Sequence, residues 1–280
     1  MLLKIPKKLV EADWLFSNLE NKDLIILDAT ISKVTSSVNP SVENKQIKNA
    51  RFFDIKNTFS NANAKFPNTI LSPEEFQTKA QELGINSNSC IVVYDDLGMY
   101  SSPRVWWMFT LMGFKNIAVL NGGFPAWKEK YFPIENKTQH NFSKGNFKVN
   151  HQPEKLVFTD EVLSATTNNN FLIVDARSSG RFFGTEPEPR NDVKSGHIPN
   201  SINLPYDELF EKGNLKPSAK LKQIFEEINP ANKQLIFSCG SGITASILAF
   251  TANLVGCRNT AVYDGSWTEW GSSTNLPIEI

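Results

Sequence analysis

The apolar positions of the chain form short continuous runs, separated by longer stretches in which apolar and polar residues mix. Leu24–Thr30 (LIILDAT) and Gln234–Cys239 (QLIFSC) are such runs, and they are typical of strands buried on both faces of a parallel sheet. Ser72–Leu83 (SPEEFQTKAQEL) begins with a serine N-cap, a proline and early glutamates, which predicts a helix. Ser218–Ile228 is its counterpart further along. This alternation predicts an α/β fold with mostly parallel sheets flanked by helices.

The same pattern occurs twice along the chain, in the same order. The matching segments are Leu24–Thr30 with Leu172–Arg177, Ile47–Ile55 with Ile198–Tyr206, Cys90–Asp95 with Gln234–Cys239, and Ile117–Trp127 with Thr260–Trp270. A repeat of this kind predicts two copies of one α/β unit. Asp95 occupies the position in the first copy that Cys239 occupies in the second.

A polar segment separates the two copies. Residues 135–155 are rich in Asn, Lys, Gln and His and have no apolar period, which is typical of a linker. His140 and His151 fall in this segment, where we expect solvated side chains. We therefore predict three parts: an N-terminal domain over residues 1–137, a linker over 138–155 and a C-terminal domain over 156–280.

The charge balance excludes a general attraction to nucleic acid or to anionic membranes. Lys plus Arg and Asp plus Glu both number 29 in the 280 residues, so recognition by charge must be local. No apolar run approaches the roughly 18 residues of a membrane span. Met1–Leu15 contains acidic residues and has no apolar signal region. We expect a cytoplasmic protein.

The three cysteines are widely spaced, with no C-x-x-C sequence and no histidine pair nearby. This pattern argues against a disulfide framework and against a zinc site, and it fits a reducing compartment. Cys90 lies in an apolar run and Cys257 near a predicted helix end, where packing is the expected role. His197 lies in a turn before a strand, and we expect it to bond to the backbone rather than to act as a base.

Cys239 differs from the other cysteines because of the loop that follows it. A Gly-Ser-Gly sequence comes directly after it, and Ala245–Leu254 then has the pattern of a helix. Glycines adopt positive φ at low cost, so the loop can turn its N–H groups inward beside the helix N-terminus. Such a cradle would favour a thiolate, each unit of pKa lowering from about 8.5 being worth roughly 1.4 kcal/mol, and it would also hold a persulfide. A cysteine that is merely buried is the alternative interpretation.

The loop Cys239–Ala245 (CGSGITA) is similar to the CGSG(V/I)TA signature of the 3-mercaptopyruvate sulfurtransferases of the rhodanese superfamily. Thiosulfate-preferring rhodaneses typically carry basic residues after the cysteine, whereas this loop is neutral. The other segments that resemble the family are Phe52–Ile55, Tyr100–Phe109, Gly180–Arg190, Gly196–Pro199 and Tyr263–Trp270. The resemblance implies two rhodanese-like domains, of which only the second is catalytic.

The resemblance also implies the substrate-binding residues. Arg181 and Arg190 match two arginines that bind the carboxylate and keto group of the mercapto-acid, and charge-assisted bonds of this kind contribute about 1.5 to 3 kcal/mol each. Without the resemblance, pairing of these arginines with Glu186 or Glu188 would be the simpler interpretation. The loop residues expected to bind the substrate are Gly240, Gly242, Ile243 and Thr244.

Two further catalytic residues rest on the same resemblance. Ser241 and Asp54 match a serine and an aspartate proposed in the family to activate or protonate the transferred sulfur. An aspartate that ends a strand is otherwise often a cap or turn residue. Several relatives carry a histidine between Ala62 and Pro67, where this chain has Ala64 or a neighbour. This departure puts a histidine-dependent relay in question.

The implied reaction is a double displacement in which sulfur moves from 3-mercaptopyruvate to Cys239, with release of pyruvate, and then to an acceptor. The acceptor is cyanide, a small thiol or a reduced thioredoxin-like protein, and no metal or organic cofactor is implied. The alternatives are a thiosulfate:cyanide sulfurtransferase and a non-enzymatic persulfide carrier. A cysteine-dependent phosphatase would need an arginine at the sixth position after the cysteine, where this chain has Ala245.

Overall fold

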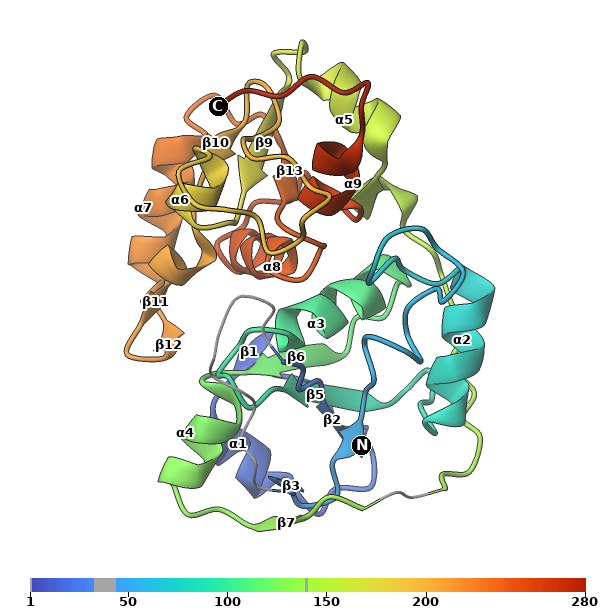
Figure 1. The fold of residues 1–280 in the computed structure, drawn as a ribbon. Coiled ribbons are helices and arrows are strands. Elements are labelled where there is room, and N and C mark those ends of the chain that lie inside the picture. The colour runs from blue at the N-terminus through green and yellow to red at the C-terminus, as the bar shows by residue number, and fades with distance from the viewer. Residues whose placement is uncertain (1, 33–43, 139–140) are drawn as a thin grey trace. The chain divides into compact units, whose positions relative to one another are not determined.

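The computed structural model describes residues 2–32, 44–138 and 141–280. The chain divides into two compact units (Figure 1): unit 1 comprises Met1–Ala62 and Ile70–Gln152, and unit 2 comprises Asn63–Thr69 and Pro153–Ile280. Unit 2 therefore includes a short segment from the first half of the sequence. The exact domain boundaries proposed from the sequence stay predictions. Residues 139 and 140 of the predicted linker, including His140, lie outside the described residues.

Unit 1 is built on a five-stranded parallel sheet. The strand order is β1 (Leu9–Val10), β6 (Ile117–Leu120), β5 (Cys90–Tyr94), β2 (Leu24–Asp28) and β4 (Arg51–Phe52). The helices of this unit are α1 (Ala12–Ser17), α2 (Pro73–Glu82), α3 (Ser102–Leu111) and α4 (Gly123–Glu129). A separate antiparallel pair joins β3 (Lys45–Ile47) to β7 (Ile134–Asn136).

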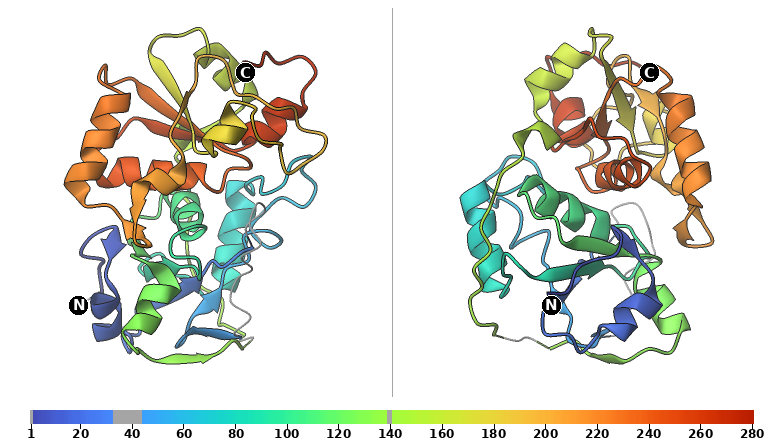
Figure 2. Two further views of the ribbon diagram at one scale, coloured as in Figure 1. Left: turned by 60° about the vertical axis from the view of Figure 1, so that its left-hand side comes forward. Right: turned by 180° about the vertical axis from the view of Figure 1, so that it is seen from behind.

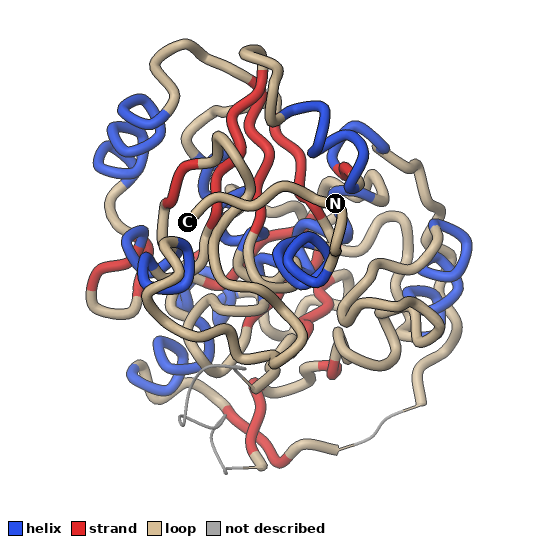
Figure 3. The backbone as a smooth tube through the Cα atoms, turned by 45° about the horizontal axis from the view of Figure 1, so that its top comes forward, coloured by secondary structure: helices blue, strands red, loops and turns tan. Residues whose placement is uncertain are grey.

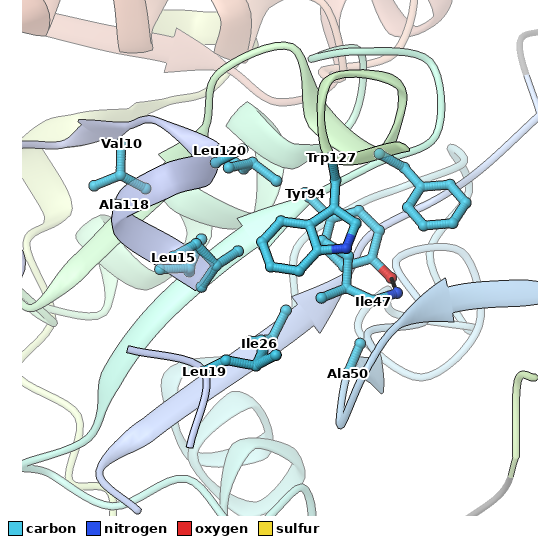
Figure 4. Packing of buried hydrophobic residues seen from close by; sticks show 13 residues of the cluster. Val10, Leu15, Leu19, Ile26, Ile47, Ala50, Tyr94, Ala118, Leu120 and Trp127 are labelled. Atoms are coloured by element: carbon cyan, nitrogen blue, oxygen red, sulfur yellow. Dashed lines mark hydrogen bonds between the residues drawn. The ribbon is translucent and has the colours of Figure 1, made fainter. Parts of the chain in front are cut away.

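Helices cover both faces of the unit 1 sheet, and Figure 2 shows α2 and α4 on its opposite sides. Figure 4 shows the core beneath α1 and α4, where Tyr94 and Trp127 pack with aliphatic side chains. The Tyr94 hydroxyl accepts a 3.1 Å hydrogen bond from the backbone N–H of Ile47. A second core joins α2 to α3 through stacked and edge-on aromatic rings: Phe53, Phe59, Phe76, Phe109 and Phe147. Burial of these rings is the main force holding the layers together.

Unit 2 repeats this architecture. The strand order is β10 (Ile202–Asn203), β9 (Phe171–Asp175), β13 (Gln234–Ser238), β14 (Thr260–Tyr263) and β8 (Leu156–Val157), all parallel. The helices are α5 (Thr159–Ala165), α6 (Ser179–Phe182), α7 (Ser218–Ile228), α8 (Ala245–Leu254) and α9 (Ser266–Ser272), with 3₁₀ turns η1 (Pro153–Lys155) and η2 (Tyr206–Leu209). A hairpin joins β11 (Phe210–Glu211) to β12 (Asn214–Leu215).

The unit 2 sheet also has two cores. One contains residues of α5 and α9 packed with Ile173 and Ile236 of neighbouring strands. On α7, Phe225 meets Phe237 of β13 at 6.4 Å between ring centroids. Figure 1 shows α5 and α9 on one side of β9 and β13 and α7 on the other. Ile236 and Phe237 are adjacent on one strand and therefore point to opposite faces.

The predicted α/β fold with two similar, mostly parallel sheets is confirmed. The predicted helix Ser218–Ile228 has the observed bounds of α7, and Ala245–Leu254 those of α8. Helix α2 begins at Pro73, after a capping box in which the Ser72 hydroxyl accepts from the N–H of Glu75. Among the described residues, none of the helices combines the length and apolar character needed to cross a bilayer.

The loops after β9 and β13 begin side by side, at the carboxyl ends of two neighbouring inner strands of the unit 2 sheet. Asp175 and Ser238 are paired in the parallel register, and the N–H of Ala176 donates to the carbonyl of Ser238 at 2.9 Å. Figure 3 distinguishes the strands, in red, from the loops that connect them, in tan. Because ligands of open parallel sheets bind outside the carboxyl ends of the strands, Cys239 is placed where chemistry is expected.

Candidate active site

Cys239 follows β13 directly and opens the loop that leads into α8. Its side chain is buried, with 1% of the residue exposed. Gly242 has φ +80°, a conformation that favours glycine, and it turns the chain into the first turn of α8. The strand, tight loop and helix predicted from the sequence are therefore present, with the cysteine at the helix N-terminus.

Ser266 anchors the cysteine from the start of α9. Its hydroxyl accepts a 3.2 Å hydrogen bond from the backbone N–H of Cys239, lies 3.9 Å from the Cys239 Sγ and donates to the carbonyl of Tyr263 at 2.8 Å. The residue is fully buried and has φ +50°, which costs a non-glycine residue about 1 kcal/mol. No sequence motif marks Ser266, although the internal repeat aligns it with Gly123, whose φ is +55°.

Ser241 lies within the same loop and is 8% exposed. The side-chain amide of Asn68 donates to its hydroxyl at 3.0 Å and to its carbonyl at 3.3 Å. Asn68 lies in the segment Asn63–Thr69, which belongs to unit 2 and also contains Ala64. The side-chain amide of Asn68, which does not titrate, therefore contacts Ser241. No sequence motif marks Asn68.

Arg181 lies close to the backbone of Gly240, and Arg190 is linked to it through the Thr268 hydroxyl. A Cβ at Gly240 would lie 3.3 Å from Nη2 and 3.8 Å from Nη1 of Arg181, so the guanidinium lies close over this glycine. Nη1 of Arg190 donates to the Thr268 hydroxyl at 3.1 Å, and that hydroxyl donates to the carbonyl of Gly240 at 2.5 Å. Of the two arginines matched by resemblance, Arg181 thus lies beside the residue that follows Cys239, and Arg190 is connected to that residue through Thr268.

Arg181 is also paired with Glu188, one of the two partners considered from the sequence. The Arg181 Nη2 to Glu188 Oε2 distance is 2.6 Å. The second oxygen of Glu188 accepts from Nη1 of Arg177 at 2.7 Å. Burial alone would lower the pKa of Arg177. The carboxylates of Asp175 and Glu188 outweigh this effect and hold the pKa of Arg177 above its ordinary value. The four charges form one buried network beside the loop.

Ile243 and Thr244 complete the turn between the loop and α8. Ile243 is 5% exposed, and Thr244 is the N-cap residue of the helix, with helical backbone angles. Their carbonyls accept from the N–H groups of Ser246 and Ile247 at 3.2 and 3.0 Å. The two residues are therefore fixed by the first turn of α8. Their role in binding a substrate stays a prediction.

Asp54 belongs to unit 1, where it shapes a turn. Its Oδ1 accepts from the backbone N–H and from the side-chain amide of Asn57, both at 3.1 Å, and its Oδ2 accepts from the same amide at 2.9 Å. Its carbonyl accepts from the N–H of Phe59 at 2.9 Å. This is the turn role that an aspartate at a strand end commonly has. Its catalytic role stays a prediction.

The position equivalent to Cys239 in unit 1 is filled by the carboxylate of Asp95. Oδ2 accepts from the N–H groups of Ser101 and Ser102 at 3.0 and 2.8 Å and from the Ser102 hydroxyl at 2.7 Å. Oδ1 accepts from the N–H of Leu97 at 3.0 Å. Asp95 is fully buried, so the first loop already holds an anion of its own.

The remaining cysteines and His197 have structural surroundings. Burial, together with Asp23, raises the pKa of the Cys90 thiol to about 11, and burial also raises the pKa of the Cys257 thiol. His197 Nδ1 is 3.0 Å from the carbonyl of Phe182, and its ring stacks on that phenylalanine at 3.9 Å. In residues 2–32, 44–138 and 141–280, no three or more His, Cys, Asp or Glu side chains gather where a metal ion could bind.

Comparison with known proteins agrees with this architecture. Residues 11–130 and 158–273 each match the family model of the rhodanese-like domain. The chain is 34% identical over 274 residues to 3-mercaptopyruvate sulfurtransferase of Escherichia coli (strain K12), an alignment that covers 96% of this chain and 97% of the relative. It is 35% identical over 294 residues to thiosulfate/3-mercaptopyruvate sulfurtransferase 1, mitochondrial, of Arabidopsis thaliana, covering 96% and 77%.

A solved structure gives the same result. The crystal structure of SseA from Escherichia coli, described as showing the rhodanese fold and catalytic mechanism of 3-mercaptopyruvate sulfotransferases, superposes with a TM-score of 0.82. The sequence identity is 32%, and the superposition covers 93% of this chain and 99% of SseA. The likeness therefore extends over both units.

Proposed function

Because the chain belongs to the rhodanese family and is a sulfurtransferase with tandem domains, we propose that it transfers sulfur from 3-mercaptopyruvate through a persulfide on Cys239. The observation that carries this proposal is the position of Arg181 close over Gly240, with Arg190 linked to the same glycine through Thr268. Two arginines connected to the residue that follows Cys239 suit a donor that carries a carboxylate and a polar carbonyl near its transferable sulfur.

The reaction has two displacement steps. The Cys239 thiolate attacks the sulfur of the donor, an S–S bond forms, and the C–S bond of 3-mercaptopyruvate breaks. The electron pair of that bond leaves with the carbon as the enolate of pyruvate, which takes up one proton. An acceptor thiolate then attacks the outer sulfur of the persulfide and regenerates the Cys239 thiolate. Cyanide in place of the thiol gives thiocyanate.

The neutral loop favours the mercapto-acid over thiosulfate as the donor. Gly240, Ser241 and Gly242 add no charge beside Cys239, while Arg181 lies close to Gly240 and Arg190 bonds to Thr268, which bonds to Gly240. Each arginine can donate more than one hydrogen bond in a fixed plane, which matches a carboxylate with an adjacent keto group. Thiosulfate is the second candidate, since the Arabidopsis thaliana relative is named for both donors.

The natural acceptor is proposed to be a small thiol or a reduced thioredoxin-like protein. A persulfide is released by attack of a thiolate on its outer sulfur, so a reactive, accessible thiol is the chemistry required. The proposed site residues remain Cys239, Ser241 and Asp54 for catalysis. A cytoplasmic location also remains a prediction.

The deciding experiment compares the two donors with one thiol acceptor. We expect kcat/KM for pyruvate release from 3-mercaptopyruvate to exceed that for sulfite release from thiosulfate by at least about tenfold, or roughly 1.4 kcal/mol. R181A and R190A should raise KM for 3-mercaptopyruvate about ten- to a hundredfold. A preference for thiosulfate would replace the proposed donor. Loading of Cys239 without turnover, seen by mass spectrometry, would instead indicate a persulfide carrier.

A further inference from the structure

Glu188 lies between two guanidinium groups beside the sulfur-carrying loop. Its Oε1 accepts from Nη1 of Arg177 at 2.7 Å and from Nε of Arg181 at 3.2 Å, and its Oε2 accepts from Nη2 of Arg181 at 2.6 Å. Only 4% of the side chain is exposed. Both carboxylate oxygens are therefore bound, and each arginine limits the movement of the other.

Arg177 is fixed more firmly than Arg181. Its Nε donates to both oxygens of Asp175 at 3.1 and 3.0 Å, and its Nη2 donates to the carbonyl of Gly196 at 2.8 Å. Its guanidinium also lies over the ring of Trp267, 4.4 Å from the centroid. Since 1% of the side chain is exposed, Arg177 is an immobile support for Glu188, and Asp175 ties it to the end of β9.

Arg181 ends this chain of contacts at the loop. Its side chain is 15% exposed and is therefore less enclosed than that of Arg177. Without partners, an arginine side chain of this kind would lose up to about 2 kcal/mol of rotamer entropy on binding a ligand. Nε and Nη2 are held by Glu188, while Nη1 donates to no acceptor in the part of the chain that the structure describes. Nη2 lies 3.3 Å and Nη1 3.8 Å from the Cβ position of Gly240, so the end of the guanidinium that carries the unbonded Nη1 lies close to this glycine.

We infer that Glu188 is a positioning residue that holds the Arg181 guanidinium over Gly240, with Arg177 and Asp175 as its anchor. The donor carboxylate then meets an arginine whose orientation is already set, so less entropy is lost on binding. The inference depends on the proposed function for the identity of the donor. Recognition of a carboxylate beside Cys239 is independent of turnover and can be tested separately.

The main variant is E188Q, with E186Q as its matched control. Glu186 is an exposed carboxylate of the same loop that bonds to the Ser178 hydroxyl at 3.0 Å and contacts neither arginine. We expect E188Q to raise KM for 3-mercaptopyruvate at least tenfold while kcat changes less than threefold, and E186Q to leave both within twofold. In the double variant E188Q/R181A, KM should rise no more than in R181A alone, because both changes remove the same interaction with the donor carboxylate.

A second measurement uses alkylation instead of turnover. Iodoacetate carries a carboxylate and iodoacetamide does not, and both alkylate a thiolate with loss of iodide. The rate at Cys239 is followed by peptide mass spectrometry, which separates it from Cys90 and Cys257. E188Q should lower the ratio of the iodoacetate rate to the iodoacetamide rate at least fivefold, and E186Q should leave it unchanged. A loss of general loop structure would change both rates together and leave the ratio unaltered.

A shorter carboxylate guards against loss of folding. E188D keeps the charge beside Arg177 but cannot reach both arginines with the same geometry, so we expect an intermediate KM and an intermediate ratio. If a folded E188Q keeps the wild-type KM and the wild-type ratio, Glu188 does not position Arg181. If wild-type protein does not turn over 3-mercaptopyruvate while the ratio still falls in E188Q, the proposed donor is wrong and the positioning role stands.

Discussion

The loops after β5 and β13 occupy equivalent places in the two units but hold different groups. In both units, the backbone carbonyl of the first loop residue accepts a 2.9 Å hydrogen bond from a backbone N–H of the helix after the next strand. The N–H of Phe124 donates to the carbonyl of Asp95, and the N–H of Trp267 donates to the carbonyl of Cys239. In unit 1, the carboxylate of Asp95 has four hydrogen-bond donors. In unit 2, a thiol, which is a weak hydrogen-bond partner, stands at this position.

The difference shows that one loop position holds a carboxylate bound by four donors in unit 1 and a thiol in unit 2. Unit 1 satisfies its loop permanently with a side chain, which stabilises the fold and leaves no nucleophile. Unit 2 places a sulfur there, and we propose that a persulfide forms on it during the reaction. If the proposed function is right, the exchange of one residue for another separates a structural loop from a reactive one.

The largest expected effect comes from making the second loop resemble the first. C239D should abolish sulfur transfer, with at least about a thousandfold loss of pyruvate release, because a carboxylate cannot carry sulfane sulfur. Its carboxylate should be accepted by the loop as Asp95 is, so the free energy of unfolding should change by less than about 1 kcal/mol. A loss of several kcal/mol in urea titrations would mean that the two loops do not share anion-binding geometry.

Removing the anion of unit 1 should cost stability. D95A leaves three N–H groups and one hydroxyl without their acceptor in a buried site, and we expect about 3 kcal/mol of lost unfolding free energy. D95N, which keeps one acceptor oxygen, should lose less. Denaturant unfolding followed by circular dichroism measures both, with D54N as the control for a partly exposed turn aspartate. Equal stability of D95A and wild type would contradict the structural role of the carboxylate.

The glycine turns of the two units should not be interchangeable. Gly123 and Ser266 are equivalent, but a Cβ at Gly123 would lie 2.4 Å from the Asp95 carbonyl oxygen and 2.6 Å from that of Gly98. We expect G123S to destabilise unit 1 by about 2 kcal/mol, from this clash with backbone atoms and from the positive φ. G213S is the matched control, because Gly213 has φ +80° with nothing within 4 Å of its Cβ position. A G123S loss no larger than that of G213S would exclude the clash.

The smallest expected effect concerns Ser266. S266A should lower the unfolding free energy by about 1 kcal/mol, since the N–H of Cys239 loses its acceptor while the unfavourable φ remains. S266G loses the same hydrogen bond but relieves the backbone strain, so it should be the more stable of the two by about 0.5 kcal/mol. Thermal unfolding of the two variants side by side would show this order. The reverse order would mean that Ser266 is not strained.

The sequence predicted the parts of the site that depend on neighbours along the chain. Buried parallel strands are continuous apolar runs and the loop glycines adjoin Cys239, so strand, loop and helix could be identified. Contacts between distant residues could not. Asn68 is 173 positions from Ser241 and resembles any turn asparagine, and Ser266 is marked only by its alignment with Gly123. Arg181 and Arg190 came from resemblance, because their approach to Gly240 depends on the path of a long irregular loop.

The segment Asn63–Thr69 limits how the two repeats can be separated by genetic engineering. A fragment that begins at residue 156 would contain Cys239, Arg181 and Arg190 but would lack Asn68, which contacts Ser241. The second repeat is therefore not a self-contained module, and a transplant or a circular permutation that omits residues 63–69 would leave Ser241 without its contact from Asn68.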